Sequence, residues 1–392
     1  MFSKNLKYYR LRNNLSMKEL ANRIGVTSMA ISNYEKGIRT PDMQILRNLA
    51  DALQVNVMDF MSVRNKDLKF VHGAFRKNSR LGKNKQELVR ESVEEYFNRF
   101  YCIISILGET VLPKAPKCHA MQLCDDDEVN AKILRSFLNI APEGPVGNLV
   151  DILENNGILI FIHEFNDTGF SGINGMINSR PYIAINKSMN PERQRFTIVH
   201  ELVHMFFIWP NDLNESACDN KSNAIAGAFL FPCNDAIREL GIRRTGVYKD
   251  MELSAQEFGI SMLCLAYRAK EVKIVSEAVF KDFMMKVSRA GWRKNEPSRI
   301  EPEKSTLFQQ LVYRAVAEGE ISVQKGAELL QVSYAEVEEA LLFCLSKAKN
   351  EVASYGKEME TCGSAYCAGE FIACLSLSLR SGPSVTVWGF GP

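Results

Sequence analysis

Two histidines and a glutamate lie close together in one apolar stretch, in the order His200-Glu201-x-x-His204. Residues four apart lie on the same face of an α-helix, so both imidazoles can reach one zinc ion. Glu201 points to the adjoining flank, where its carboxylate can take a proton from water instead of binding the metal. The neighbouring residues are apolar, which predicts burial. The spacing therefore predicts a zinc site with Glu201 as the general base, and the alternative is an exposed helix face with coincidental histidines.

The third ligand of such a site has to come from elsewhere, because catalytic zinc takes three protein ligands and keeps one position open. The downstream carboxylates are Asp212, Glu215 and Asp219. Residues 219–231 read as a second helix that Pro232 ends. Packed beside the first helix, it can bring Asp219 to the metal. Glu215 lies about one helical turn earlier and stays a second candidate.

The elements that must hold this site follow from the pattern along the chain. β-Branched runs predict strands at 157–163 and 181–186, separated by Gly- and Asn-rich turns. From residue 191 to about residue 349 the sequence is mainly helical. An extended substrate segment is expected to pair with an edge strand near residues 182–186. The order predicts a multidomain, mainly α protein, with an all-α head and an α+β body that contains a small sheet.

Residues 1–61 read as a compact set of short helices. Ser16 and Glu19 have the spacing of a capping box, and Thr27 or Ser28 can cap the next helix. Thr40-Pro41 is expected to open another. Residues 1–100 hold 19 Lys and Arg against 10 Asp and Glu, although the whole chain is nearly neutral at +2. This excess predicts that the head contacts a polyanion.

Composition excludes several classes of protein. A length of 392 residues implies two or three domains, and 46% hydrophobic with 24% charged residues excludes a mostly disordered chain. Ten scattered cysteines without a C-x-x-C pair exclude a disulfide scaffold and a zinc ribbon. The apolar runs are far shorter than the roughly 20 residues of a membrane helix. We therefore expect a cytoplasmic protein that does not contact a membrane.

The body resembles the ImmA/IrrE family of zinc metallopeptidases over residues 125–275. The resemblance implies zinc held by His200, His204 and Asp219, with Glu201 as the general base. The family usually has Glu at the position of Asp219, and because Asp is one methylene shorter, Glu215 stays a second candidate. The implied reaction is the cleavage of a repressor or antitoxin, which derepresses genes. The match rests on Arg195-Phe196-Thr197-x-x-His200-Glu201-Leu202-x-His204 and on Asn223-x-x-Ala226-x-x-Phe229-Leu230-x-Pro232.

The head resembles the Cro/repressor-type (XRE) helix-turn-helix over about residues 5–60. The resemblance implies that residues 27–36 form the recognition helix, with its N-terminal half in the major groove. The match rests on Leu20-Ala21, Ile24-Gly25-Val26, Ile31-Ser32-x-Tyr34-Glu35-x-Gly37 and Leu46-x-x-Leu49-Ala50-x-Ala52-Leu53. The implied DNA contacts are Thr27, Ser28, Ser32, Asn33 and Lys36.

These patterns predict five segments along the chain. They are a DNA-binding head (1–61), a basic linker with a connecting helix (62–124), a metallopeptidase domain (125–275), a helical C-terminal module (276–349) and a Cys-, Gly- and Ser-rich tail (350–392) that we expect to be poorly ordered. The expected partners are operator DNA, bound through residues 1–61, and a protein substrate, while a homodimer is left open.

An alternative function belongs to a different class. The chain could be a DNA-binding transcription factor whose ImmA/IrrE-like domain is a non-catalytic sensor or partner-binding module, in a toxin–antitoxin or phage-related system. The aspartate at position 219 favours this alternative, and the intact His-Glu-x-x-His motif favours the peptidase.

Overall fold

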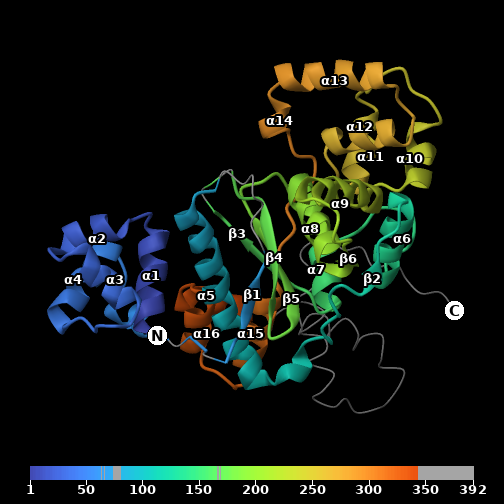
Figure 1. Cartoon of the computed structure of the whole chain (residues 1–392). Helices are drawn as coiled ribbons and strands as arrows, with labels where there is room; N and C mark the ends of the chain where they lie inside the picture. Colours follow the sequence, from blue (N-terminus) through green and yellow to red (C-terminus); the bar gives the residue numbers. More distant parts are fainter. Residues whose placement is uncertain (63, 66, 74–80, 166, 168, 343–392) are drawn as a thin grey trace, which may run out of the picture. The chain divides into compact units, whose positions relative to one another are not determined.

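The computed structural model describes residues 1–62, 64–65, 67–73, 81–165, 167 and 169–342 (Figure 1). It confirms a multidomain, mainly α protein. The described residues form two compact units, one of residues 1–96 with 112–305 and one of residues 97–111 with 306–342. Most of the expected C-terminal module lies in the described part, whereas the tail at 350–392 lies outside it. Within the described residues, no helix combines the length and the apolar character needed to cross a bilayer.

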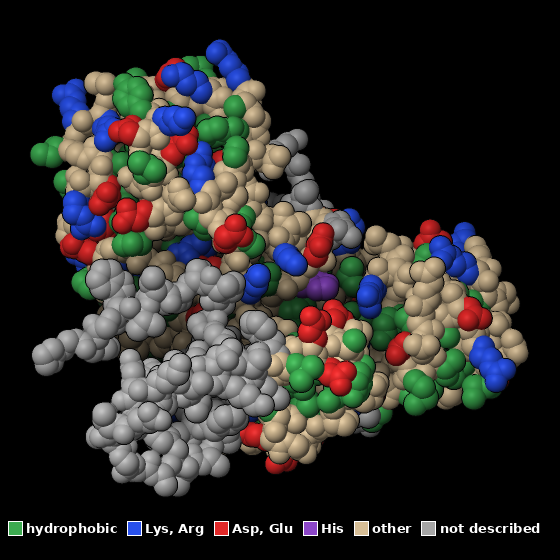
Figure 2. Space-filling view, turned by 180° about the vertical axis from the view of Figure 1, so that it is seen from behind, with side chains coloured by type: hydrophobic (Ala, Val, Ile, Leu, Met, Phe, Trp, Pro, Cys, Tyr) green, Lys and Arg blue, Asp and Glu red, His purple; other side chains and the backbone are tan. Residues whose placement is uncertain are grey.

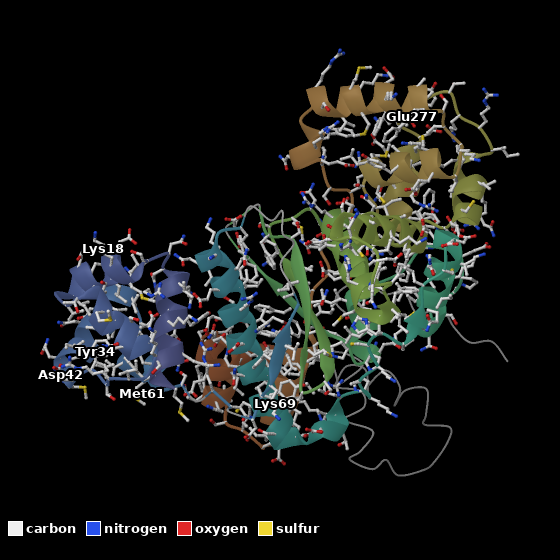
Figure 3. All side chains as sticks on the ribbon, viewed as in Figure 1. Lys18, Tyr34, Asp42, Met61, Lys69 and Glu277 are labelled. Atoms are coloured by element: carbon white, nitrogen blue, oxygen red, sulfur yellow. The ribbon has the colours of Figure 1, made fainter. Side chains whose placement is uncertain are left out.

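The head is built from short capped helices, as the sequence predicts. Ser16 Oγ accepts from the backbone N–H of Glu19 at 3.1 Å, and Glu19 Oε2 accepts from the N–H of Ser16 at 2.7 Å, which confirms the capping box. Thr27 caps the third helix. The fourth begins later than predicted, because Asp42, labelled in Figure 3, caps it in place of Thr40-Pro41. The elements are α1 (Phe2–Arg12), α2 (Met17–Ile24), α3 (Ser28–Glu35), α4 (Met43–Leu53) and the 3₁₀ turn η1 (Val57–Met61).

Packing inside the head fixes α3 against α1. Ile31 and Tyr34 of α3 are buried in the core of the head. The guanidinium of Arg10, also buried, donates to both carboxylate oxygens of Glu35 at 2.5 and 2.9 Å, and to the carbonyl of Leu15 at 2.8 Å. A buried ion pair with two parallel bonds has one favourable geometry, so it sets the orientation of α3.

A four-stranded sheet in the order β1-β4-β5-β3 lies at the centre of the larger unit. β5 is parallel to β3 and antiparallel to β4, and the short β1 is antiparallel to β4. Asn178 and Ser179 join β4 to β5 with positive φ angles, as two-residue hairpin turns require. The strands are β1 (Phe70–His72), β3 (Leu159–His163), β4 (Gly172–Ile177) and β5 (Arg180–Asn186).

The sheet confirms two expectations and corrects three. β3 and β5 occupy the predicted strand regions. β4 forms where turns were expected, and β1 forms inside the stretch expected to be a linker. β5 lies between β4 and β3, so the expectation of a substrate edge near residues 182–186 is wrong, because both sides of that strand are already paired. The edge strands of the sheet are β1 and β3, and β1 pairs with β4 over residues 175–177.

Helices cover both faces of the sheet (Figure 1). α8 (Pro191–Phe206) packs against β4 and β5 on one face, with α9 (Glu215–Leu230) and α6 (Asp127–Phe137) beside it. α5 (Lys83–Leu107), the expected connecting helix, meets the other face, where Tyr96 stacks on Phe161 at 4.3 Å between ring centroids. The predicted burial around the motif is confirmed, since Ile198, Val199, Leu202 and Val203 are at most 1% exposed.

The remaining elements surround this centre. α7 precedes β3, and a two-stranded parallel pair, β2 and β6, flanks α8. Five helices follow α9 in the larger unit, and α15 and α16 belong to the smaller one. Their bounds are α7 (Leu149–Asn155), η2 (Glu109–Val111), β2 (Met121–Gln122), β6 (Phe207–Ile208), α10 (Cys233–Leu240), α11 (Met251–Phe258), α12 (Met262–Glu271), α13 (Glu277–Arg289), α14 (Trp292–Asn295), α15 (Leu307–Ala317) and α16 (Val323–Leu330).

A buried arginine ties α9 to the loop that follows α6. Arg135 is 1% exposed, and its guanidinium donates to the carbonyls of Phe229, Ala141 and Gly144, each at 2.8 Å. Burial lowers the pKa of Arg135 to about 10, against the opposing effect of Asp235 and Glu143. The three carbonyl bonds compensate for removing this charge from water and hold α9 in place beside α8.

Candidate metal centre and DNA-facing helix

Two helices bring three potential metal ligands together. α8 starts at Pro191, whose missing N–H costs nothing in the first turn, and it places His200 and His204 one turn apart. Their Nε2 atoms are 3.0 Å apart. Asp219, one turn inside α9, places Oδ1 at 3.6 Å from Nε2 of His200 and 3.3 Å from Nε2 of His204. Three ligand atoms that the sequence spreads over 20 positions therefore form one compact triangle.

The triangle has the size that zinc requires. With bonds of about 2.0–2.1 Å in a tetrahedron, donor atoms lie roughly 3.3 Å apart. The three observed separations scatter around that value. Two imidazole nitrogens and one carboxylate oxygen are also a donor set that zinc accepts in catalytic sites. Glu215, the other candidate, starts α9 and is not part of this cluster.

A neighbouring amide orients the first histidine. His200 is 2% exposed, and its Nδ1 lies 2.9 Å from Oδ1 of Asn223, on the same helix as Asp219. An amide oxygen only accepts, so Nδ1 carries the proton and Nε2 presents its lone pair to the triangle. Side chains of His204 and Asp219 are each 25% exposed, so the triangle is accessible from that side.

Glu201 is held beside the triangle by the sheet. It is 7% exposed, and its Oε2 accepts a hydrogen bond of 2.7 Å from Nδ2 of Asn174 in β4. The amide fixes one carboxylate oxygen next to the strand edge. Gly172 keeps β4 close to α8, because a Cβ there would lie 2.8 Å from Cγ2 of Thr197. Sequence reasoning missed Asn174, and the one available signal was an asparagine between two glycines in a short alternating stretch.

Two further side chains border the ligands. The ring of Trp209 lies 5.4 Å from that of His204, between centroids, and packs against it. Cys218 precedes Asp219, and burial together with the Asp219 charge raises the pKa of its thiol. A thiol with a raised pKa is a poor zinc ligand near neutral pH, because zinc binds the thiolate.

In the head, α3 presents the expected DNA contacts at its exposed start and end. Thr27, Ser28 and Lys36 are exposed, whereas Ser32 and Asn33 are partly buried. On the face shown in Figure 2, Lys and Arg side chains alternate with Asp and Glu side chains, without one continuous basic patch.

Comparison with known proteins identifies two regions. Residues 6–60 match the family model described as helix-turn-helix, and residues 153–270 match the peptidase-family model described as IrrE N-terminal-like domain. An uncharacterized HTH-type transcriptional regulator, YqaE, of Bacillus subtilis (strain 168) is 39% identical over 57 residues. The matched stretch is 14% of this chain, and the chain spans about half (49%) of the length of that relative. The chain thus joins a helix-turn-helix domain of the XRE type to an IrrE/ImmA-like peptidase-family domain.

Proposed function

We propose that this chain is a DNA-binding transcriptional regulator whose IrrE-like domain is a zinc metallo-endopeptidase. The observation that carries the proposal is the triangle of His200, His204 and Asp219 with Glu201 beside it. These residues would hold a Zn²⁺ ion, and the zinc would supply Lewis-acid polarisation of the scissile carbonyl and of the attacking water. The donor geometry supports zinc over a hard cation such as Mg²⁺, which prefers oxygen ligands.

The side chains of this chain divide the remaining work. The carboxylate of Glu201 takes the proton of the attacking water and passes it to the amine that leaves. Asn174 restrains Oε2 of Glu201. The carboxylate therefore faces the triangle before the reaction begins and does not have to become ordered during it. Asn223 keeps the Nε2 lone pair of His200 directed at the ligand position. The packing of Trp209 on His204 limits the movement of the more exposed ligand.

The substrate we propose is a repressor or antitoxin, cut at a limited number of bonds in the cytoplasm. The combination of a peptidase-family domain with a DNA-binding head supports this class, because the head would bring the peptidase to proteins that occupy the same operator. Cleavage would then lift repression at that operator.

The test compares wild type with Glu201→Gln in cells. We expect one repressor fragment, seen by mass spectrometry of protein termini, to disappear in the variant while the purified variant keeps its zinc. Glu215→Gln is the matched control, since that carboxylate is outside the ligand cluster, and it should leave the fragment in place. A purified protein without zinc and an unchanged set of fragments would refute the peptidase and leave the sensor or partner-binding alternative.

A further inference from the structure

The segment that follows the head lies on the sheet edge beside the proposed general base. In β1, Phe70 is opposite Ile177 and His72 is opposite Gly175. The N–H of Gly73 then donates to the carbonyl of Asn174 at 2.8 Å. Asn174 is the residue whose side chain holds Glu201. One residue of β4 therefore binds the interdomain segment through its backbone and the base through its amide.

One side chain anchors β1 across the sheet. Nδ1 of His72 lies 2.6 Å from the hydroxyl of Tyr182 in β5, and its Nε2 lies 3.3 Å from Oε1 of Glu94 in α5. Burial raises the pKa of Tyr182, so the phenol stays protonated and donates to Nδ1. Nε2–H can then donate to the carboxylate of Glu94.

A glycine makes this anchor possible. Gly175 lies between His72 and Tyr182, and a Cβ there would be 2.5 Å from the Tyr182 hydroxyl and 2.5 Å from the carbonyl of Val71. Any larger residue would separate β1 from the sheet. The glycine thus leaves a passage through which a side chain on the edge strand reaches β5.

β1 is a short strand and is partly exposed. It has three residues, and Val71 is 58% exposed. Beyond the ladder, the N–H of Lys69, labelled in Figure 3, donates to Oδ1 of Asn178 at 2.8 Å. Backbone groups on a sheet edge are the usual docking site for an extended peptide, and a peptide bound there would need the positions that β1 occupies.

We propose that β1 is a built-in occupant of a peptide-binding edge on β4, so that the interdomain segment competes with extended peptides for the position beside Glu201. This inference rests on the proposed peptidase function, because the competing peptide belongs to the class of substrate that the peptidase would cleave. The competitor is an extended segment that pairs antiparallel with residues 174–177. It carries an imidazole at the position of His72, where one ring nitrogen accepts from the Tyr182 hydroxyl and the other donates to Glu94.

The test uses a fluorescent peptide with the sequence of residues 68–73, added to the full chain in the Glu201→Gln background. His72→Ala releases β1, so the peptide should bind at least about tenfold more tightly than to the parent, because a competing state is removed. Val71→Ala is the matched control on the same strand and should bind like the parent. Gly175→Ala closes the passage and should bind neither β1 nor the peptide. A peptide with Ala in place of its histidine should bind more weakly.

A second readout does not need the peptide affinity. Hydrogen exchange of the amides at 70–73 should accelerate at least about tenfold in His72→Ala, and the added peptide should restore the protection of residues 174–177. Equal peptide affinity for the parent and His72→Ala, or no binding to any variant, would overturn the proposal. The binding test does not depend on hydrolysis. If the peptide competes with β1 but the cellular test shows no cleavage, only the proposed peptidase is refuted. Cleavage without competition would refute this inference alone.

Discussion

Asn223 and His200 lie on adjacent helices with 2.9 Å between Oδ1 and Nδ1, and this contact selects the tautomer of the most buried ligand. We predict that Asn223→Ala weakens zinc binding by about 10–100-fold, the usual effect of losing such a partner. The measurement is competition with a chromogenic chelator. Asn214→Ala is the control, because Asn214 caps the same helix through the N–H of Ala217 and should reduce stability by about 1 kcal/mol without this loss of affinity. Similar affinities for both variants would contradict the assigned tautomer.

The second prediction concerns DNA. Lys36→Ala should weaken binding to all duplexes alike and reduce the slope of log K against log salt by about 1, because one phosphate contact is lost. Asn33→Ala should cost about 1–3 kcal/mol on a duplex selected with the wild-type protein and little on a random duplex, because asparagine pairs with adenine. Fluorescence anisotropy over a salt series measures both. Lys281→Ala in α13 is the charge-matched control. If it lowered the slope equally, α3 would not be the contact.

Acid should weaken the attachment of the head to α5. Burial alone would raise the pKa of Glu94, but hydrogen bonds from His72 and Lys4 outweigh it and lower the pKa from 4.5 to about 2. A depressed pKa stabilises the folded state above pH 4.5 and loses this effect as the pH falls towards 2. The contribution is at most about 3 kcal/mol. Urea unfolding of wild type and Glu94→Gln should therefore differ at pH 7, differ less at pH 3 and converge only near pH 2.

The control for this titration is Glu87→Gln. Glu87 pairs with Lys7 at 2.5 Å, but its side chain is 44% exposed, so the pair should contribute under about 1 kcal/mol. An equal, pH-dependent loss in both variants would mean that overall charge, and not the buried carboxylate, is responsible.

The fourth prediction tests the packing of α9. Arg135→Ala leaves the carbonyls of Phe229, Ala141 and Gly144 without their donor, and we expect it to destabilise the protein by at least about 3 kcal/mol. Lys286→Ala is the control, because that side chain is 70% exposed and its partner Asp282 is 56% exposed. Its effect should stay within about 1 kcal/mol in thermal unfolding. Since α9 carries Asp219 and Asn223, Arg135→Ala should also lower zinc occupancy.

The head and the ligand helices were predictable because their signals are local. A capping box needs two residues three apart, and a zinc pair needs two histidines four apart on one helix. Two strand regions were predictable from their β-branched composition. The role of Asp219 as a third ligand could be predicted from helix spacing together with the family resemblance. The structure brings Asp219 to the two histidines.

The missed features depend on contacts between distant residues. β4 contains Gly172 and Gly175, which weaken strand propensity, and both are needed only because Thr197 and Tyr182 approach them in the fold. β1 is a strand only because β4 offers it an edge. Asn174 has no motif, and its role follows from facing Glu201. α4 begins after Thr40-Pro41 because the side chain of Asp42 accepts from the N–H of Ile45 and caps the helix there.

The contacts of Asn5 have a practical consequence for dissecting the molecule. Its amide donates to the carbonyls of Phe60 and Ser62, and its oxygen accepts from Nε of Arg64, whose Nη1 pairs with Glu91 of α5 at 2.9 Å. A fragment that stops at residue 61 would remove two of these partners and expose the base of α1. The helix-turn-helix is therefore not a freely exchangeable cassette. Grafting it onto another protein, or replacing it with a foreign head, requires carrying Ser62, Arg64 and a docking helix with a carboxylate at the position of Glu91.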